Sequence, residues 1–365
     1  MFIATKEALE TALKQAIMAA QTKSTLPILS HVLVTSFVHG PHQNKVWLDA
    51  TDLTIGIRSF LPVSGSTSQR FVAPCKLFLE VVRRLPKKSQ VTVDYADNKV
   101  TIQANNGPVM TIPCMDVGDY PVIGGVNPRR PVEAQKFLDA LGRVLFAASN
   151  DQSRFNLNGV LFENAHNWTT LVATDGHRLA SALTPAMWST DTKFIVPKDA
   201  LIVAMGLFAK GKDMRFSVDD KMVTWETDAV QLRSRLIDGD YPDYRKIIPT
   251  PRETTFTANR EAWRSAIVSL EPFLGERNKG VDITVSGDMQ IVAVNPDLGT
   301  QKVKVPLLQN GHECGFLINA CYAKDALSMI TEDVVTVEWA EEGAPIVLRP
   351  AGRKDYFTLI MPMRR

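Results

Sequence analysis

Cysteine is scarce in this sequence, and the few cysteines are far apart. The four are Cys75, Cys114, Cys314 and Cys321, with no Cys-x-x-Cys pair and no histidine cluster beside them. A zinc site needs several such ligands at short spacing, so this pattern argues against one. We expect four small apolar side chains, no structural disulfide in a reducing compartment, and no metal or other cofactor.

Long hydrophobic runs are also missing. The apolar run at residues 200–208 is much shorter than the ~20 residues that cross a bilayer. The N-terminal segment contains acidic side chains where a signal peptide has an apolar stretch. These features predict a cytoplasmic protein with no membrane partner.

An excess of one charge is the third absence. The sequence has 41 Lys and Arg against 39 Asp and Glu, for a net charge of +2. Domains that bind nucleic acid usually carry a clear basic excess or a basic patch. If DNA is a partner, positive charge must be gathered on one face of a nearly neutral molecule.

A long-period repeat is the strongest positive signal in the chain. Three short apolar segments, each ending in Pro or Asn, lie 123 and 122 residues apart. They are Phe71–Pro74, Phe194–Pro197 and Phe316–Asn319, and a helix with apolar periodicity is expected after each. Such self-similarity indicates tandem copies of one structural unit.

Other landmarks keep the same period. Leu48–Asp52 recurs as Leu171–Asp175 and, more weakly, as Ile291–Asn295, and Asp119–Pro121 returns as Asp240–Pro242. Stretches rich in Pro and Gly separate the copies. A chain of 365 residues is long enough for two or three domains. We therefore predict three domains, at residues 1–125, 126–251 and 252–365.

Each copy is predicted to combine two helices with antiparallel strands. Strands with period-2 alternation are expected, and the Asp97-Asn98 pair between two of them is typical of a hairpin turn. The fold class is α+β. The expected helices cover residues 6–20, 77–85, 134–148, 200–208, 260–270 and 323–330.

Much of the basic charge falls on the predicted helices. Lys136 and Arg143 share a helix face at a spacing of seven residues, and Arg260 and Arg264 share one at a spacing of four. Many acidic residues instead fall in strands and hairpin turns. If the helices line one side of an assembly, that side is positive and can contact phosphates without reading bases.

Catalytic motifs are nearly absent. No P-loop, dinucleotide-binding fingerprint, G-x-S-x-G or H-E-x-x-H occurs. Asp175 and His177 could form an acid–base pair with Ser234 or Ser149 as the nucleophile, but the first copy has Asp52 without a histidine. An Asp-Gly pair at a strand end is also typical of a plain turn. We predict a protein that is not an enzyme and keep this enzyme as an alternative.

Specific motifs extend over the whole chain, from Met1 to Arg365. They are Thr25–Leu29, Leu157–Glu163, Val172–Ala180, Asp238–Tyr244 and Met361–Arg364. In order and spacing the chain resembles the beta subunit of bacterial DNA polymerase III, the sliding-clamp family. The sequences VATDGHRLA and MPMR are the most specific parts of this resemblance.

The resemblance implies three tandem DNA-clamp domains, each with two helices on antiparallel sheets, and a head-to-tail homodimeric ring. In such a ring the helices line a pore around double-stranded DNA. A clamp loader opens the ring, and the replicative DNA polymerase, repair polymerases and mismatch-repair proteins bind to it. The implied function is that of a processivity factor. A clamp variant from a phage, a plasmid or a spare chromosomal copy, with specialised partners, stays an alternative.

The resemblance also implies a peptide-binding pocket. Lys246 lies where the family often has arginine, and Arg365 lies where an apolar residue is common, so both departures bear on peptide preference. The pocket positions are Leu157, Thr174, Gly176, His177, Arg178, Leu179, Pro242, Lys246, Ile247, Ile360, Met361, Pro362 and Met363.

A subunit interface and a DNA-facing surface follow from the same resemblance. Met110 and Ile112 are placed against Phe273 and Leu274 of the partner subunit, so a charge at Ile112 is predicted to open the ring. Pro272 departs from the aliphatic residue that the family tends to have there. The predicted DNA contacts are Lys23, Lys136, Arg143, Arg260 and Arg264.

Overall fold

The computed structural model describes most of the chain. Both predicted domain boundaries, together with Lys23 and Arg365, lie outside the described residues. The described residues are 1–20, 25–37, 44–105, 107–121, 123–124, 130–209, 213–249, 256–275, 279–310 and 312–364.

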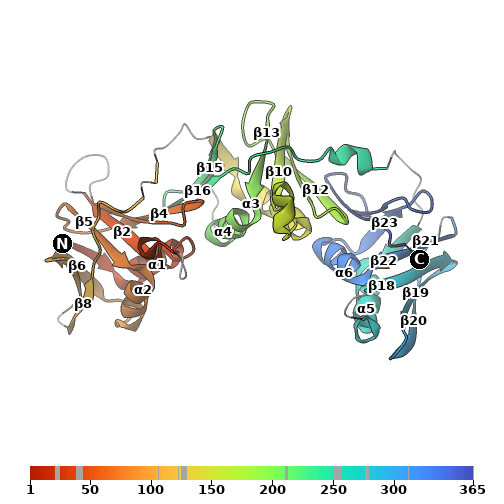
Figure 1. Cartoon of the computed structure of the whole chain (residues 1–365), viewed down its shortest axis with the longest axis horizontal. Helices are drawn as coiled ribbons and strands as arrows, with labels where there is room; N and C mark the ends of the chain where they lie inside the picture. Colours follow the sequence, from red (N-terminus) through yellow and green to blue (C-terminus); the bar gives the residue numbers. More distant parts are fainter. Residues whose placement is uncertain are drawn as a thin grey trace. The chain divides into compact units, whose positions relative to one another are not determined.

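The described elements follow one order three times (Figure 1). Each repeat has two halves with the same order of elements. Each half consists of one strand, one helix and three further strands. The first repeat consists of β1 (Phe2–Thr5), α1 (Lys6–Ala16), β2 (His31–Ser36), β3 (Lys45–Thr51), β4 (Ile55–Pro62), β5 (Gln69–Pro74), α2 (Cys75–Arg84), β6 (Gln90–Ala96), β7 (Lys99–Ala104) and β8 (Val109–Pro113).

The second and third repeats have the same order, with one extra strand, β21, in the third. The second consists of β9 (Arg130–Glu133), α3 (Ala134–Val144), β10 (Gly159–Ala165), β11 (Trp168–Thr174), β12 (Arg178–Pro185), β13 (Lys193–Pro197), α4 (Lys198–Phe208), β14 (Asp213–Val218), β15 (Met222–Glu226) and β16 (Val230–Arg235). The third consists of β17 (Phe256–Asn259), α5 (Arg260–Leu270), β18 (Gly280–Ser286), β19 (Asp288–Asn295), β20 (Gly299–Val305), β21 (Leu307–Asn310), β22 (Cys314–Asn319), α6 (Ala320–Met329), β23 (Val334–Glu338), β24 (Ile346–Pro350) and β25 (Tyr356–Ile360). Short 3-10 helices are η1 (Pro27–Ser30), η2 (Leu145–Ala147), η3 (Gln152–Leu157), η4 (Tyr244–Ile247) and η5 (Glu271–Phe273).

The strands form two short and two long antiparallel sheets. Each long sheet joins two repeats: β4 pairs with β16, with Gly56 opposite Arg233, and β12 pairs with β25, with Leu179 opposite Leu359. Each short sheet has a free edge, at β8 and at β20, among the residues that the structure describes. The strand orders are β1-β6-β7-β8, β5-β2-β3-β4-β16-β15-β14-β9, β13-β10-β11-β12-β25-β24-β23-β17-β21 and β20-β19-β18-β22.

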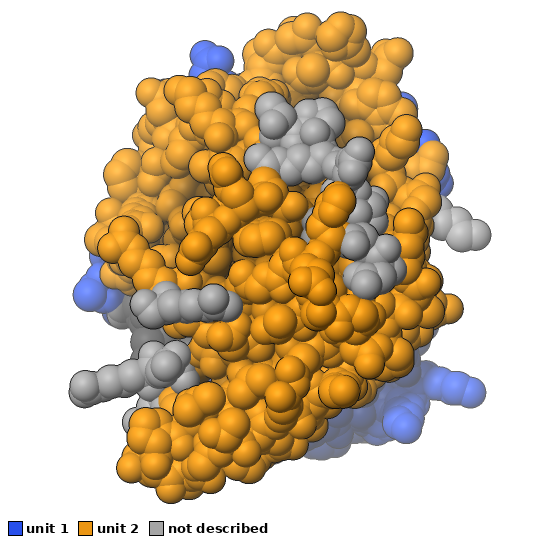
Figure 2. Space-filling view, turned by 90° about the vertical axis from the view of Figure 1, so that its right-hand side faces the viewer, with its two compact units in different colours: residues 1–134, 202–236 blue, residues 135–201, 237–365 orange. Residues whose placement is uncertain are grey.

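The chain divides into two compact units, which Figure 2 colours separately. Unit 1 comprises residues 1–134 and 202–236, and unit 2 comprises residues 135–201 and 237–365. The division falls inside the second repeat because each long sheet holds strands of two neighbouring repeats. Backbone pairing within a sheet, not membership of a repeat, therefore decides which strands belong together.

The helix-start residues that the sequence indicates are confirmed, although α2, α4 and α6 begin two to three residues earlier than the predicted ranges. Pro74 directly precedes α2, Pro197 directly precedes α4, and the Asn319 side chain before α6 accepts a hydrogen bond from the Cys321 N–H at 2.9 Å. Such a cap satisfies one of the first N–H groups of a helix, which have no partner inside it. None of the helices in the described ranges is long and apolar enough to cross a membrane.

Two helices end four residues earlier than predicted. The predicted helix over residues 6–20 ends at Ala16. The Ile17 N–H still bonds four residues back, to Leu13, but the N–H groups of Met18 and Ala19 bond to carbonyls three residues back. The predicted helix over residues 134–148 ends at Val144, where η2 begins. In both cases the last apolar turn is tighter than an α-helix, as is common at helix ends.

The predicted hairpin at Asp97-Asn98 is confirmed. Both residues have positive φ, at 52° and 57°, and Ala96 pairs with Lys99 across the turn. Positive φ at both central residues defines the two-residue turn that matches the twist of antiparallel strands.

Glu10 on α1 carries a pH-dependent contribution to stability. Its carboxylate contacts Lys14 Nζ at 2.6 Å and Lys6 Nζ at 2.8 Å, and these hydrogen bonds lower the pKa of Glu10 from 4.5 to about 2. A lowered pKa in the folded state means that the stabilisation is full above the unfolded pKa and is lost as the pH falls through the folded pKa. We expect the melting temperature to fall less steeply between pH 4.5 and 2 in Glu10→Gln than in the unsubstituted chain. Circular dichroism melts measure both slopes, and equal slopes would contradict the assignment.

Candidate functional site

The segment between β11 and β12 is a turn closed by its own side chains. Thr174 Oγ1 donates to the Arg178 carbonyl at 2.6 Å and accepts from the Gly176 N–H at 3.1 Å. Asp175 Oδ1 accepts from the N–H groups of His177 and Arg178 at 2.9 and 3.0 Å. The motif is therefore rigid because each of its polar residues holds the backbone of the next ones.

Gly176 is required by this turn. Its φ is +88°, and a Cβ at this position would lie 2.8 Å from Arg154 Nη1. We expect Gly176→Ala to lower the free energy of unfolding by about 1–2 kcal/mol, because alanine is strained at positive φ and the Arg154 side chain must move. Chemical denaturation measures the loss. Alanine at Gly343, where φ is +82° and nothing lies within 4 Å, is the control for strain without the contact; equal losses in the two variants would show that the contact adds nothing.

Arg178 joins the second repeat to the third. Its guanidinium donates to Asp175 Oδ2 at 3.0 Å, to Asp325 Oδ2 at 2.6 Å and to the Phe146 carbonyl at 2.9 Å. It also lies over the rings of Tyr322 and Phe146, at 4.6 and 5.2 Å from their centroids. A half-buried guanidinium with this many partners is held in one orientation.

His177 connects the turn to the C-terminal segment. Its exposed ring stacks on Tyr322, with centroids 6.3 Å apart and planes at 17°, and its carbonyl accepts from the Met361 N–H at 2.8 Å. Met363 N–H in turn donates to the Leu317 carbonyl at 2.7 Å. The terminal Met-Pro-Met segment is therefore anchored beside the turn rather than frayed.

An apolar cluster underlies these polar groups. It contains Leu157 and Leu179 of the predicted pocket, and Met361 packs against it. The other buried members are Leu161, Val172, Ile195, Tyr241, Tyr244, Val347 and Leu359. Strands of the second and third repeats thus build one apolar floor, because β12 and β25 are neighbours in the same sheet.

The predicted pocket residues separate into a floor and a rim. Leu157, Thr174 and Leu179 are buried on the floor side, whereas the buried Ile360 pairs with Arg178 and therefore points to the opposite face of the sheet. The remaining positions are exposed or half-buried: Gly176, His177, Arg178, Pro242, Lys246, Ile247, Met361, Pro362 and Met363. Ile247 is 40% exposed at the end of η4, where an apolar side chain can meet a ligand.

Sequence reasoning missed the aromatic residues of this region. Tyr244 donates to Glu163 Oε2 at 2.9 Å, and Tyr241 donates to the Val172 carbonyl at 3.4 Å. Phe155, which is 59% exposed, has its ring 3.5 Å from the place of a Cβ on Gly239. The repeated Asp-Tyr-Pro motif was a usable signal for Tyr241, whereas nothing local marked Phe155.

The terminal segment also lines a cavity in unit 2. This cavity has a volume of about 540 Å³. Its lining residues are Gly315, Phe316, Leu317, Trp339, Glu342, Gly343, Met361, Pro362, Met363 and Arg364. One face of the segment therefore meets the apolar cluster and another meets this cavity.

The geometry argues against the enzyme alternative. Both carboxylate oxygens of Asp175 are held by Arg178 and the backbone of the turn, and the His177 ring lies on Tyr322. Ser234 is fully buried and donates to the Arg235 carbonyl, while Ser149 accepts from the Asp151 N–H. None of these four side chains hydrogen-bonds to another of them in the described structure, so the nucleophile–base contact of a catalytic site is not formed.

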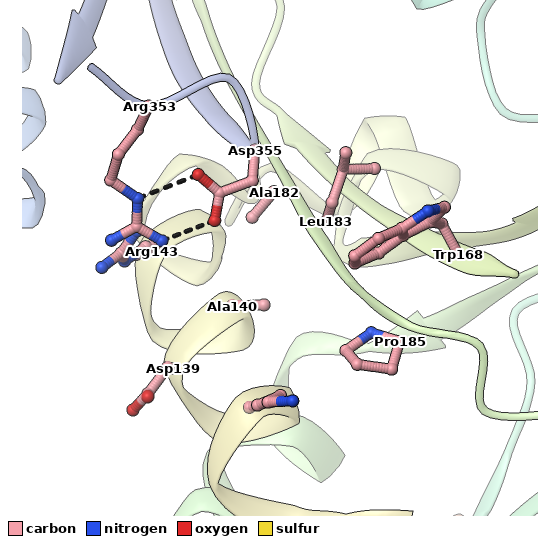
Figure 3. A pocket seen from close by; sticks show the side chains of 10 residues that line it. Asp139, Ala140, Arg143, Trp168, Ala182, Leu183, Pro185, Arg353 and Asp355 are labelled. Atoms are coloured by element: carbon pink, nitrogen blue, oxygen red, sulfur yellow. Dashed lines mark hydrogen bonds and ion pairs between the residues drawn. The ribbon is translucent and has the colours of Figure 1, made fainter. Parts of the chain in front are cut away.

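Basic charge is sorted onto the helices to a modest degree. The six described α-helices carry eleven Lys and Arg against seven Asp and Glu, whereas the rest of the chain has a net charge of −2. Lys136 and Arg143 on α3 line a cavity of about 340 Å³ with Trp168, Arg353 and Asp355 (Figure 3). The guanidinium of Arg143 donates to Thr331 Oγ1 at 3.4 Å and lies 5.6 Å from the ring centroid of Tyr356.

The charges of Arg260 and Arg264 are partly neutralised on α5. Arg264 donates through Nε and Nη2 to the two oxygens of Glu261, at 3.2 and 3.0 Å, and Arg260 Nη1 donates to the same carboxylate at 3.1 Å. The hydrogen bond from Arg264 is the main reason why the pKa of Glu261 is lowered. These two arginines therefore offer phosphates less charge than the sequence pattern predicted.

The burial of Ile112 bears on the predicted interface. Ile112 lies on the edge strand β8 but is only 1% exposed, because its side chain packs inward opposite Val100. Met110 is half-buried on the same face, whereas Val109 and Thr111 are exposed. A partner can therefore reach the backbone edge of β8 but not the Ile112 side chain. Phe273 and Leu274, at η5, are half-buried.

Comparisons with known proteins cover almost the whole chain. Family models described as the N-terminal, central and C-terminal domains of the DNA polymerase III beta subunit match residues 1–124, 131–243 and 245–364. The beta sliding clamp of Caulobacter vibrioides is 26% identical over 356 residues, covering 94% of each chain, and that of Pseudomonas putida is 24% identical, covering 100% of this chain and 99% of the relative.

Solved structures agree in fold. The DNA polymerase sliding clamp of Pseudomonas aeruginosa superposes with a TM-score of 0.93 at 23% identity, covering 100% of this chain and 99% of that one. The beta sliding clamp of C. crescentus, crystallised with polyethylene glycol bound, gives a TM-score of 0.91 at 26% identity with the same coverage. The three-repeat architecture is thus that of these clamps.

Proposed function

This chain belongs to the DNA polymerase III beta subunit family of sliding clamps, and we propose that two copies of it close head to tail into a ring around duplex DNA. The ring holds a DNA polymerase at its template without catalysing any reaction itself. The free edges of the two short sheets carry this proposal.

Strand pairing inside the chain indicates how two copies meet. In both long sheets, the last strand of the first half of one repeat pairs with the last strand of the second half of the next repeat. These pairs are β4 with β16, and β12 with β25. By this rule β20 of the third repeat pairs with β8 of a first repeat, which must come from another chain. Two chains satisfy both of these edges in each copy, because each chain supplies one β8 and one β20.

The side chains near these edges suit such a contact. Phe273 and Leu274 lie at η5, which packs against β19 and β20, and Met110 lies on β8. These half-buried apolar groups would become covered when the sheets join, while the buried Ile112 supports β8 from below.

A closed ring works by topology. Loss from DNA then requires the ring to open, so individual phosphate contacts can stay weak and permit sliding along any sequence. The excess of positive charge on the helices supports a pore lined by helices.

We assign the tether to the predicted peptide-binding pocket of unit 2, which is called the groove below. Its apolar floor with the exposed Pro242 and Ile247 at its rim suits a short linear peptide with large apolar side chains. The proposed ligands of the groove are peptides of the replicative polymerase, the clamp loader, repair polymerases and mismatch-repair proteins. We propose that the protein acts with them in the cytoplasm. A tethered polymerase gains effective concentration near the primer end, so its own affinity for DNA need not be high.

Retention on circular DNA tests this function. The protein is loaded onto nicked circles with a bacterial clamp loader and ATP, the complex is isolated, and the circle is then cut. We expect retention on circles and rapid loss after cutting. Equal retention before and after cutting would show ordinary binding and would refute the ring.

The charge at the end of α2 is expected to matter more for DNA than that of α5. Arg84, Lys87 and Lys88 are exposed with no ion pair among the described residues, whereas Arg260 and Arg264 share Glu261. Neutralising the first three should reduce the slope of log affinity against log salt by up to about 3, whereas Arg260→Gln with Arg264→Gln should reduce it by less than about 2. Fluorescence anisotropy with duplex DNA at several salt concentrations measures both slopes. A larger change for the α5 pair would contradict this ranking.

A further inference from the structure

Unit 1 contains a cavity of about 380 Å³ at the join between the first and second repeats. Its lining is mostly apolar, with Leu53 46% exposed at the mouth and Ile55 buried. The lining residues are Thr51, Leu53, Thr54, Ile55, Gly56, Pro121, Ile123, Gly124, Met222, Arg233 and Arg235.

The backbone around this cavity repeats that of the peptide groove. Thr51 Oγ1 donates to the Ile55 carbonyl at 2.7 Å and accepts from the Leu53 N–H at 3.0 Å, as Thr174 does in its own turn. Leu53 has a φ of 77°, like Gly176 in the later turn. Tyr120 donates to the Asp49 carbonyl at 2.8 Å, as Tyr241 does to that of Val172. The cavity is therefore the internal counterpart of the groove.

The chemistry of the two sites differs at two aligned positions. Gly56 pairs with Arg233 in the sheet of unit 1, where Leu179 pairs with Leu359 in the sheet of unit 2. Because Arg233 corresponds to Leu359, Arg235 corresponds to Met361 two positions later in the chain. Two guanidinium groups thus take the place of two apolar side chains of the groove.

Arg233 is a buried cation without a counterion among the described residues. It is 8% exposed, its Nε has no hydrogen-bond partner, and no carboxylate lies within ion-pair distance of it in the described ranges. Its Nη1 is 2.9 Å from the place of a Cβ on Gly124, at the cavity wall. The nearby Arg58 and Arg215 each have a carboxylate of their own, on Asp49 and on Glu226. A buried charge left unpaired is costly, so such a group is retained where a ligand completes it.

We propose that this cavity binds a short apolar peptide segment of a partner protein whose Asp or Glu carboxylate pairs with Arg233. A carboxylate can accept two parallel hydrogen bonds from a guanidinium. The flanking apolar side chains would cover Leu53, Ile123 and Met222. A peptide fits this lining better than nucleic acid, because a phosphate backbone gains nothing from the apolar wall. The proposal does not depend on the ring or on DNA binding.

Methyl NMR on the full-length protein tests the proposal. The probes are the blocked peptide Ac-Ala-Ile-Glu-Val-Ala-NH2, the same peptide with Glu replaced by Gln, and a single-stranded oligonucleotide. Ile55 and Ile123 methyls report on this cavity, and Ile247 and Ile248 methyls report on the groove. We expect the Glu peptide to shift Ile55 and Ile123, with affinity at least about tenfold above that of the Gln peptide. Equal affinities, shifts confined to the groove, or shifts at Ile55 and Ile123 from the oligonucleotide alone would overturn it.

Arg233→Leu is the matched variant, because it copies the residue that the groove has at this position. It should keep the fold, melt at the same temperature as the unsubstituted chain or higher, and lose the preference for the Glu peptide. Binding of the Glu peptide to Ile55 and Ile123 with unchanged affinity would refute the role of Arg233. A melting temperature several degrees lower would show that Arg233 has a structural partner in the free protein, which also overturns the proposal.

Discussion

Arginine in place of Ile112 is expected to destabilise unit 1 by about 3–5 kcal/mol, beyond any effect on subunit association. Ile112 is 1% exposed and packs inward opposite Val100, so the guanidinium would be buried without a carboxylate. Chemical denaturation at low protein concentration, where subunits are apart, measures this loss directly. An unfolding midpoint equal to that of the unsubstituted chain would contradict the buried position.

Met110→Arg separates folding from association. Met110 is on the same strand but half-buried, so its long replacement can reach solvent while the subunits are apart. We expect the midpoint to change little and the dimer to weaken by at least about tenfold, as measured by analytical ultracentrifugation. A dimer of unchanged affinity in Met110→Arg would count against pairing at the β8 edge.

Replacing Arg178 by methionine has the second-largest expected effect. The Arg178 side chain is 13% exposed, and its guanidinium donates to Asp175, Asp325 and the Phe146 carbonyl. The change therefore removes the bonds between the second and third repeats and leaves acceptors unsatisfied. We expect the free energy of unfolding of unit 2 to fall by about 2–4 kcal/mol. Peptide affinity should fall with it, because the turn carrying His177 loses its anchor.

Lys246→Met is the matched control for Arg178→Met. The Lys246 side chain is 81% exposed, and that of Asp243, its ion-pair partner at 3.4 Å, is 52% exposed. Exposed pairs contribute about 0–1 kcal/mol, so stability should hardly change. Similar losses in the two variants would mean that Arg178 contributes only as a surface charge.

Local sequence patterns predicted the repeat and most of its elements. The helices α4 and α5 and the Asp97-Asn98 hairpin follow from capping, periodicity and turn residues, which act over a few positions. Glu261 was also a readable signal, since it lies three residues before Arg264 on one helix face. Its neutralising effect on the predicted DNA contacts could have been anticipated.

Other features could not be read locally. On β8, residues 109, 110 and 112 are all apolar, so alternation does not tell which side faces the core. Packing of the sheet decides this, and it turns Ile112 inward. A one-residue difference in phase would exchange the two faces of the strand.

The sequence by itself determined the triplication, the helix starts, the tight turns and the membership in the clamp family, because these depend on short-range chemistry that recurs along the chain. Tertiary structure alone decided the contact of Arg178 with Asp325 and the joining of β4 to β16 and of β12 to β25. It also decided the burial of Arg233 without a counterion among the described residues. These depend on which strands become neighbours in a sheet. That pairing is a property of the whole fold, since it brings together backbone groups separated by more than a hundred residues.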